Sequence, residues 1–363
     1  MTPEQDAAVV ALANPALAIN TGEVEAIARD FGLTDDILFR TSGTSDVPKW
    51  VALSREALDA SARAVNEHLG ASSNDVWLRA LPEFHVGGYS IGIRARLAGG
   101  RVEALAAGSW DAATFAGACR NCGATLSALV PTQIYDLVAA ELVAPGDLRA
   151  VLVGGGVLAK DLKQKAASLG WRLFETYGMT EAASQVATEG TERDGMHLLA
   201  HWEARTARGG ELEIRGSALF TAYLRNEAGA WQVDQPFDTD GWFATGDRIG
   251  LDSRKLVFEG RMDAEVKVLG ERVDLDALQA RLELLAGTGF AVLAVPDDRS
   301  GNRLLLIAEG GGGDAVLAAF NDEVAGFERL TQILSVAKIP RSALGKVLRP
   351  ALEDQIAENT SEA

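Results

Sequence analysis

Between Val76 and Ala200, short apolar segments alternate with helix-like stretches, and this alternation limits the fold more than any other feature. The apolar segments are only a few residues long, which is typical of strands rather than helices. They are Val76–Ala80, Ser127–Val130, Ala150–Val153 and Arg172–Phe174. Successive strands joined through helices pair in parallel, because each helix carries the chain back across the sheet. The region therefore predicts a mostly parallel sheet with flanking helices.

The pattern changes on both sides of this region. Residues 1–36 have helical spacing, with Asn20 or Thr21 as a helix cap, and a short apolar strand follows at Asp36–Arg40. Residues 210–259 carry short alternating strands with turns, which is typical of an antiparallel lobe. Residues 264–348 return to a mixed pattern of helices and strands.

Length and charge narrow the class of protein. A chain of 363 residues is too long for one ordinary core and favours two domains. We predict an α/β fold with a large N-terminal domain (1–260) of mixed sheets, flanking helices and an antiparallel lobe, and a small C-terminal α/β domain (264–363). The 34 Lys and Arg against 51 Asp and Glu give a net charge of −17, which disfavours nucleic acid and anionic membranes as partners.

The sequence also bears on location and redox chemistry. It has no apolar run of the length that a membrane helix needs, and its acidic N-terminus lacks the features of a signal peptide, so we expect a cytoplasmic protein. Cys119 and Cys122 form a lone CxxC pair, which we interpret as the end of a helix capped by Gly123. The sequence leaves the oligomeric state open, a homo-oligomer included.

Residues 41–49 (TSGTSDVPK) form the first candidate site. A turn rich in hydroxyl groups offers O–H and backbone N–H donors to phosphates, and Lys49 adds a positive charge. The order of residues differs from the Walker A motif. Taken alone, such a string could equally be a solvated Ser/Thr loop.

Seven further segments follow in a fixed order and change that judgement. They are 81–88 (LPEFHVGG), 130–133 (VPTQ), 154–156 (GGG), 177–181 (YGMTE), 241–247 (GWFATGD), 260–263 (GRMD, with Lys267 and Gly270 after it) and 340–346 (PRSALGK). With the 41–49 loop they resemble the adenylate-forming superfamily of acyl-CoA synthetases, luciferases and peptide-synthetase adenylation domains. The resemblance extends from about residue 36 to residue 350. Within the superfamily, residues 81–94, 128–133 and 177–188 most resemble the o-succinylbenzoate–CoA ligases of menaquinone biosynthesis.

The resemblance implies a two-step ligase reaction. A carboxylate attacks the α-phosphate of ATP, giving acyl-AMP and pyrophosphate, and the thiol of CoA then displaces AMP. The implied cofactor is Mg²⁺, with ATP and CoA as co-substrates and a small carboxylic acid as substrate. Positioning and charge stabilisation carry most of the rate in such a reaction.

The resemblance also assigns roles to residues. Lys346 is the implied adenylation lysine, Glu181 the Mg²⁺ ligand, and Asp263 the hinge of a mobile C-terminal domain whose boundary lies at 261–263. The nucleotide would be bound by Thr41, Ser42, Gly43, Thr44, Ser45, Lys49, Gly154, Gly155, Gly156, Tyr177, Gly178, Thr180, Asp247 and Arg261. Of these, Tyr177 would stack on adenine near the Gly154–Gly156 turn, and Thr180 would act in catalysis by bonding a phosphate oxygen. Asp247 would accept from the ribose hydroxyls, with Arg261 supporting it. Taken singly, Glu181 and Asp247 could be turn carboxylates, Tyr177 a core aromatic and Lys346 a solvated lysine.

The acyl pocket is implied by four residues. His85 matches a family position that lines the acyl and pantetheine channel, although a lone histidine is more often structural. Arg94 matches an arginine suited to bidentate binding of the substrate's free carboxylate, and its alternative is a surface arginine on a helix. Ser184 and Gln185 follow the YGMTE motif and would border the same pocket.

Two departures from the family bear on this interpretation. Asp46 stands where the phosphate loop usually has glycine, and only 40 residues precede the loop, fewer than in relatives. Three alternatives stay open: a ligase for another aryl or keto acid, an enzyme that loads a carrier-protein thiol, and a non-catalytic nucleotide-binding relative. The retention of Lys346, Glu181, Asp247 and Arg261 together disfavours the last.

Overall fold

The computed structural model describes residues 9–41, 49–105, 110–190, 195–227, 229–262, 265–342 and 345–361. The chain divides into two compact units. The larger comprises residues 1–155, 163–245 and 249–258, and the smaller comprises residues 156–162, 246–248 and 259–363.

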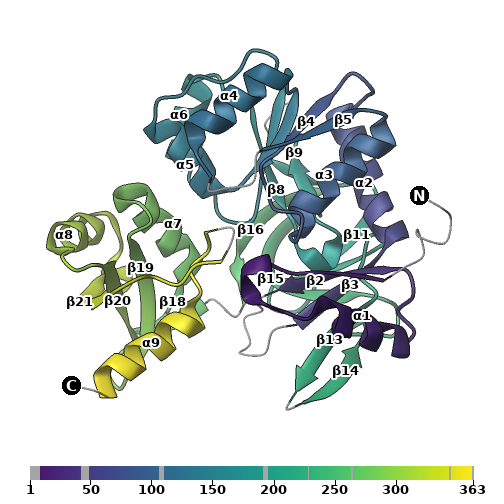
Figure 1. Ribbon diagram of the computed structural model, residues 1–363. Coiled ribbons are helices and arrows are strands. Elements are labelled where there is room, and N and C mark those ends of the chain that lie inside the picture. Colours follow the sequence, from purple (N-terminus) through teal and green to yellow (C-terminus); the bar gives the residue numbers. More distant parts are fainter. Residues whose placement is uncertain are drawn as a thin grey trace. The chain divides into compact units, whose positions relative to one another are not determined.

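A sheet of eleven strands is the main element of the larger unit, and five of its strands are parallel. The residues of the three strands at 76–79, 126–129 and 150–153 are largely buried, as expected where helices cover both faces of a parallel sheet, whereas the edge strand at 101–104 is not. The helices α2 and α3 lie on one side of these strands, and α4, α5 and α6 lie on the other (Figure 1). The elements are β4 (Val76–Arg79), β5 (Arg101–Ala104), β6 (Leu126–Leu129), β7 (Ala150–Val153), β8 (Leu173–Tyr177), α2 (Arg55–Leu69), α3 (Val86–Ala98), α4 (Ala112–Cys122), α5 (Pro131–Ala139) and α6 (Lys160–Ser168).

The same sheet continues in antiparallel strands. Strand β8 pairs with β9, β9 with β10, and β10 with β16, so the direction of pairing reverses beyond β8. The antiparallel lobe expected for residues 210–259 is divided between two sheets: residues 211–216 and 243–259 belong to this one, whereas residues 222–234 join a second sheet. The further strands of the eleven-stranded sheet are β9 (Ala187–Glu189), β10 (Met196–Leu198), β11 (Trp202–Thr206), β12 (Glu211–Gly216), β15 (Phe243–Asp252) and β16 (Lys255–Arg261).

A second sheet of the larger unit corrects the prediction for residues 1–36. Only α1 (Thr21–Asp30) and the 3₁₀ turn η1 (Pro15–Leu17) are helical in the described part of this segment, with Asn20 capping α1. Val10–Leu12 is instead the strand β1, which pairs in parallel with β2 (Asp36–Thr41). Val9 and Ala11 are buried with Leu38, so this burial outweighs the local helical spacing. The remaining strands are β3 (Lys49–Ser54), β13 (Ala222–Glu227) and β14 (Ala230–Asp234).

The smaller unit has a three-stranded sheet whose two faces are both covered. Val292, Leu304 and Leu306 pack in a cluster with α7 and α8, whereas Leu293 and Ile307 pack in a separate cluster with α9 (Figure 1). A two-stranded hairpin precedes α7. The elements are β17 (Glu265–Val268), β18 (Glu271–Asp274), α7 (Leu275–Ala286), β19 (Phe290–Asp297), β20 (Gly301–Glu309), α8 (Asp314–Glu323), η3 (Gly326–Glu328), β21 (Leu330–Val336) and α9 (Arg349–Ser361).

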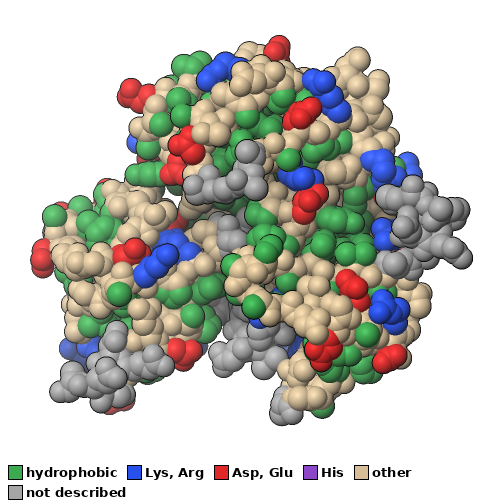
Figure 2. Space-filling view, viewed as in Figure 1, with side chains coloured by type: hydrophobic (Ala, Val, Ile, Leu, Met, Phe, Trp, Pro, Cys, Tyr) green, Lys and Arg blue, Asp and Glu red, His purple; other side chains and the backbone are tan. Residues whose placement is uncertain are grey.

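Two surface properties complete the description. None of the described helices is long and apolar enough to cross a membrane. Figure 2 shows acidic and basic side chains in small, separate groups over the face that it draws, with no broad basic patch among the described residues.

Candidate active site

The segment after β8 is a closely packed loop that brings several predicted site residues together. Gly178 is essential to it, because a Cβ at this position would lie 1.7 Å from the carbonyl oxygen of Ser184. The backbone N–H of Val186 donates to the carbonyl of Tyr177 at 2.8 Å, which closes the loop at the start of β9. The 3₁₀ turn η2 (Thr180–Ala182) lies within it.

The carboxylate of Glu181 is held by two groups from neighbouring strands. Lys49 Nζ, at the start of β3, lies 2.9 Å from Glu181 Oε1, and Tyr223 OH, in β13, donates to the same oxygen at 2.8 Å. Burial and the negative charge of Glu181 raise the pKa of Tyr223, so its hydroxyl stays a donor. Sequence reasoning does not find Tyr223, because this residue belongs to none of the eight motifs.

One carboxylate is enough for the implied metal. Mg²⁺ at nucleotide sites is commonly bound by one or two carboxylates together with substrate phosphates and water. Glu181 Oε2 accepts no hydrogen bond from the residues that the structure describes, so its lone pairs are open to a cation. Within the same described ranges there is no group of three or more His, Cys, Asp or Glu residues that could bind a metal by itself. The site thus fits a cation that arrives with a nucleotide.

Arg94 is a buried arginine, so its alternative as a surface residue of a helix is wrong. Its side chain lies in α3 with 1% exposure, and its Nη2 donates to Ser184 Oγ at 3.2 Å. Its guanidinium carbon lies 5.8 Å from the centre of the Trp77 ring. Burial lowers the pKa of Arg94 to about 10, which leaves it charged at neutral pH.

No carboxylate among the described residues pairs with Arg94. Its Nε, the Oγ of Ser90 one helical turn earlier, and the Nε1 of Trp77 are all buried without a hydrogen-bond partner in that part of the chain. An unpaired buried charge is costly unless an anion compensates it. The surroundings of Arg94 therefore favour the binding of an anionic group.

His85 and Gln185 are the other two residues predicted for the acyl pocket. His85 is at the N-cap of α3 and makes no side-chain cap bond. Burial lowers the pKa of His85 to about 4, so the imidazole is neutral at pH 7. Gln185 is buried, and its Oε1 accepts from Thr188 Oγ1 at 2.6 Å, an arrangement that fixes its amide.

The predicted adenine site contains a second close approach. A Cβ on Gly154, directly after β7, would lie 2.5 Å from Thr176 Oγ1, and Gly155 has a φ of 79°, so a side chain is disfavoured at both. The Tyr177 ring is buried and lies 5.8 Å from the ring of Phe258. Stacking of Tyr177 on adenine stays a prediction, as does a role for Gly156, which falls in the smaller unit.

The smaller unit contains three further predicted residues, namely Asp247, Arg261 and Lys346. Arg261 Nη1 donates to the buried Asp247 Oδ1 at 3.1 Å, so the predicted ribose ligand Asp247 and its predicted support Arg261 form an ion pair. Lys346 Nζ lies 3.1 Å from Asp276 Oδ2 and is half exposed. Thr41, in the larger unit, ends β2, whereas Ser42, Gly43, Thr44, Ser45, Asp46 and Asp263 lie outside the described residues.

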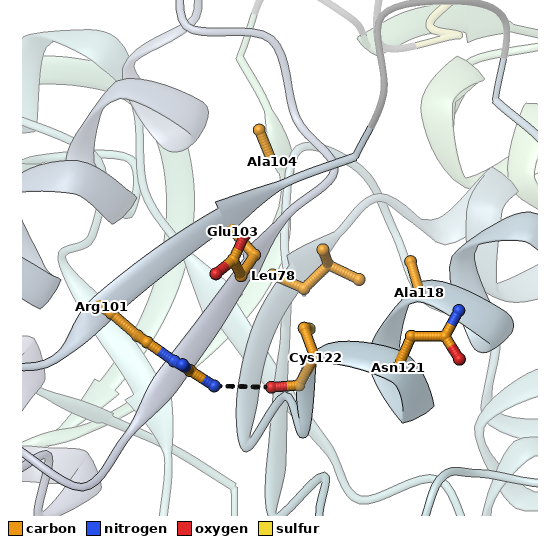
Figure 3. A pocket seen from close by; sticks show the side chains of 7 residues that line it. All are labelled: Leu78, Arg101, Glu103, Ala104, Ala118, Asn121 and Cys122. Carbon is orange, nitrogen blue, oxygen red and sulfur yellow. Dashed lines mark hydrogen bonds between the residues drawn. The ribbon is translucent and has the colours of Figure 1, made fainter.

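A hollow elsewhere in the larger unit contains none of the predicted site residues. It measures about 460 Å³ and is lined by side chains from β4, β5 and α4, with Arg101 donating to the carbonyl of Cys122 at 2.9 Å (Figure 3). Both cysteines are free, and burial raises the pKa of Cys119 to about 12. Gly123 ends α4 in the left-handed conformation, as the structural interpretation of the CxxC pair expects.

The glycines after β7, the carboxylate of Glu181 with one open oxygen and the buried Arg94 are the features that the resemblance predicts for a nucleotide-dependent enzyme acting on acids. The chain belongs to the AMP-binding enzyme family, whose sequence pattern matches residues 36–224. The predicted superfamily and the prediction of an enzyme are confirmed by this match.

Individual relatives agree with the family. A probable 2-succinylbenzoate–CoA ligase from Mycobacterium tuberculosis is 31% identical over 342 residues, covering 90% of this chain and 86% of the relative. A 2-succinylbenzoate–CoA ligase from Salmonella typhimurium is 30% identical, covering 88% of this chain and 68% of the relative.

Solved structures of similar proteins share the fold. A variant of MenE from E. coli with bound OSB-AMS has a TM-score of 0.70 and 26% identity, covering 88% of this chain and 68% of that one. An o-succinylbenzoate CoA synthetase from Bacillus subtilis, in complex with the acyl-adenylate OSB-AMP, has a TM-score of 0.75 and 24% identity, covering 88% and 69%. The predicted α/β fold class is confirmed, while the mobility of the smaller unit stays a prediction.

Proposed function

We propose that this enzyme activates 2-succinylbenzoate with ATP and transfers the acyl group to CoA. The structural observation that supports this acid is the buried guanidinium of Arg94, which donates to Ser184 and pairs with no carboxylate among the described residues. A dicarboxylic acid can place one carboxylate on Arg94 while the other reacts. The ligases from M. tuberculosis and S. typhimurium support this choice of acid by their names.

The first half-reaction joins the acid to the nucleotide. A carboxylate oxygen attacks the α-phosphorus of ATP, the bond to the β-phosphate breaks, and pyrophosphate leaves. Lys49 and the 41–49 loop bind the β- and γ-phosphates, and Thr180 donates to a phosphate oxygen. Lys346 neutralises charge between the acid and the α-phosphate. Mg²⁺ bound through Glu181 would supply further positive charge at the phosphates. The B. subtilis synthetase, solved in complex with ATP and a magnesium ion, supports this choice of metal.

The second half-reaction forms the thioester. The thiol of CoA attacks the acyl carbon, the C–O bond to AMP breaks, and the thiol proton passes to solvent or a base. His85 borders the acyl group. Because its imidazole is uncharged at neutral pH, it neither attracts the free carboxylate of the acid nor repels a cation. The hinge at Asp263 separates the two half-reactions by moving Lys346.

Location and partners follow from these co-substrates. ATP and CoA are cytoplasmic metabolites, so we place the enzyme in the cytoplasm. Its partners are then small molecules, namely the dicarboxylic acid, ATP and CoA. Its strongly negative net charge speaks against nucleic acid as a partner.

Pyrophosphate release measured over a panel of carboxylic acids tests the proposal. The panel contains 2-succinylbenzoate, analogues that lack either carboxylate, and other aryl and keto acids. Fastest release with the dicarboxylate, followed by a CoA thioester, is the expected result. Faster release with another acid would make the chain a ligase for that acid, and transfer only to a carrier protein would change the acceptor. Binding of ATP without release for any acid would favour a non-catalytic relative.

A further inference from the structure

The two groups that hold Glu181 differ in rigidity. Lys49 reaches Glu181 through a flexible four-carbon stem at the edge of the predicted phosphate loop. Tyr223 reaches it from β13, whose register places Tyr223 opposite Val51 and Arg225 opposite Lys49 in β3. Lys49 and Tyr223 are therefore diagonal neighbours on adjacent strands, and Lys49 Nζ lies 3.8 Å from the centre of the Tyr223 ring.

The Tyr223 ring is fixed by its surroundings. It is 5% exposed, its centre lies 4.6 Å from the ring of Phe220, and the Arg225 guanidinium lies 5.0 Å from it on the same strand. The backbone N–H of Phe220 also donates to the carbonyl of Glu181 at 2.9 Å, which ties the two segments together. The hydroxyl of Tyr223 therefore has one well-defined position beside the carboxylate.

The two donors engage only one oxygen of Glu181. Oε1 accepts from both Lys49 and Tyr223, whereas Oε2 has no donor among the described residues. A carboxylate fixed through one oxygen presents the other in a defined direction. Phosphates of a bound nucleotide would compete for the ammonium of Lys49, whereas the phenol of Tyr223 has no other described hydrogen-bond partner.

We propose that Tyr223 is a positioning residue for the metal ligand Glu181, keeping Oε1 fixed so that Oε2 faces the cation of the metal–nucleotide complex. This inference rests on the proposed function, because it needs Glu181 to bind Mg²⁺. Partners of metal ligands in other proteins orient the ligand in the same way, and their loss typically weakens metal binding by about 10- to 100-fold.

Tyr223→Phe tests the proposal, because it removes the hydroxyl and keeps the ring. Calorimetry would measure the affinity for an α,β-methylene analogue of ATP with Mg²⁺ and, separately, in EDTA. The ratio of the two affinities is the contribution of the metal. We expect this ratio to fall about 10- to 100-fold in Tyr223→Phe, with the affinity in EDTA retained as evidence of an intact fold.

Thr221→Val is a matched control two residues away. Thr221 Oγ1 donates to Asp36 Oδ1 at 2.6 Å, so this variant also removes a hydroxyl bonded to a buried carboxylate, but one outside the site. Its metal contribution should equal that of the wild type. A loss of similar size in both variants would overturn the proposal, since it would show a general effect of weakening this segment.

Glu181→Gln distinguishes a failure of the Tyr223 proposal from a failure of the metal assignment of Glu181. If Glu181→Gln removes the metal contribution and Tyr223→Phe leaves it within twofold of wild type, only the role of Tyr223 is overturned. If the wild type gains no affinity from Mg²⁺, or Glu181→Gln leaves the gain unchanged, the metal assignment of Glu181 fails and the inference falls with it.

Discussion

The ammonium of Lys346 lies 3.1 Å from the carboxylate of Asp276, which also accepts from Arg349. Arg341 supports the backbone next to this lysine by donating to the carbonyls of Gly345, Thr288 and Phe290. The ion pair with Asp276 is half exposed on the lysine side, so its contribution to stability is small. Breaking this ion pair therefore costs little free energy.

Lys346→Ala should slow acyl-AMP formation by about 10²- to 10³-fold, as for the loss of other single electrostatic donors. ATP affinity should change little, since most triphosphate contacts are predicted in the 41–49 loop. Rapid-quench measurement of acyl-AMP, and of thioester from pre-made acyl-AMP and CoA, checks this. Equal slowing of both half-reactions would instead identify Lys346 as structural.

Arg94→Ala should weaken recognition of the acid far more than that of ATP. Truncating one partner of a buried charge pair typically costs ~2–5 kcal/mol, so kcat/KM for 2-succinylbenzoate should fall by about 30-fold or more. Arg96→Ala is the control, because Arg96 lies two residues away and pairs with Asp59 at an exposed position. An unchanged KM for the acid in Arg94→Ala would remove this residue from the pocket.

Gly178→Ala should destabilise the larger unit by about 3 kcal/mol or more, because the added methyl group overlaps a backbone carbonyl. Gly117→Ala is the control: Gly117 lies within α4, and a Cβ added there would meet nothing within 4 Å, so alanine should stabilise that helix slightly. Chemical denaturation of both variants measures the difference. Equal stability of the two variants would show that the 178–185 loop can rearrange.

His201 should make stability fall as pH drops from about 6.5 to about 4. Burial, with a smaller effect of Arg254, lowers the pKa of His201 to about 4. Between the two pKa values the unfolded chain binds a proton that the folded chain does not, so acid favours unfolding. Denaturation of His201→Phe over this pH range should show a shallower loss than the wild type, with a residual slope from His85, whose pKa burial also lowers. An identical slope would contradict the shifted pKa.

The parallel strands and α2 are predictable from the sequence because their signals are local. Short apolar runs mark β4, β6 and β7, and α2 begins after Ser54, a residue type that is preferred at the N-cap of helices. The prediction fails for β1, whose formation depends on pairing with β2 some 25 residues later. Lys49–Ser54 forms the strand β3, for which no element is predicted although residues 50–53 are a continuous apolar run.

The candidate site shows the same division. Motif residues such as Glu181 and Lys346 are found through the family resemblance, and the structure gives them definite partners. Tyr223 and Trp77 cannot be found this way, because their importance arises from tertiary contacts with Glu181 and Arg94. No short-range sequence pattern indicates that the Tyr223 phenol will contact Glu181 or that the Trp77 indole will lie near Arg94.

The buried charge of Arg94, which no carboxylate among the described residues compensates, has a practical consequence for finding the natural acid. Without a bound acid the folded protein bears the cost of this buried cation, and an acid that supplies an anion removes that cost, so binding of the acid should raise the melting temperature. A library of acids could therefore be ranked by melting temperature alone, before any turnover is detected. Compounds with a carboxylate that reaches Arg94 would raise the melting temperature more than compounds that only fill apolar space. The ranking would therefore indicate the substrate.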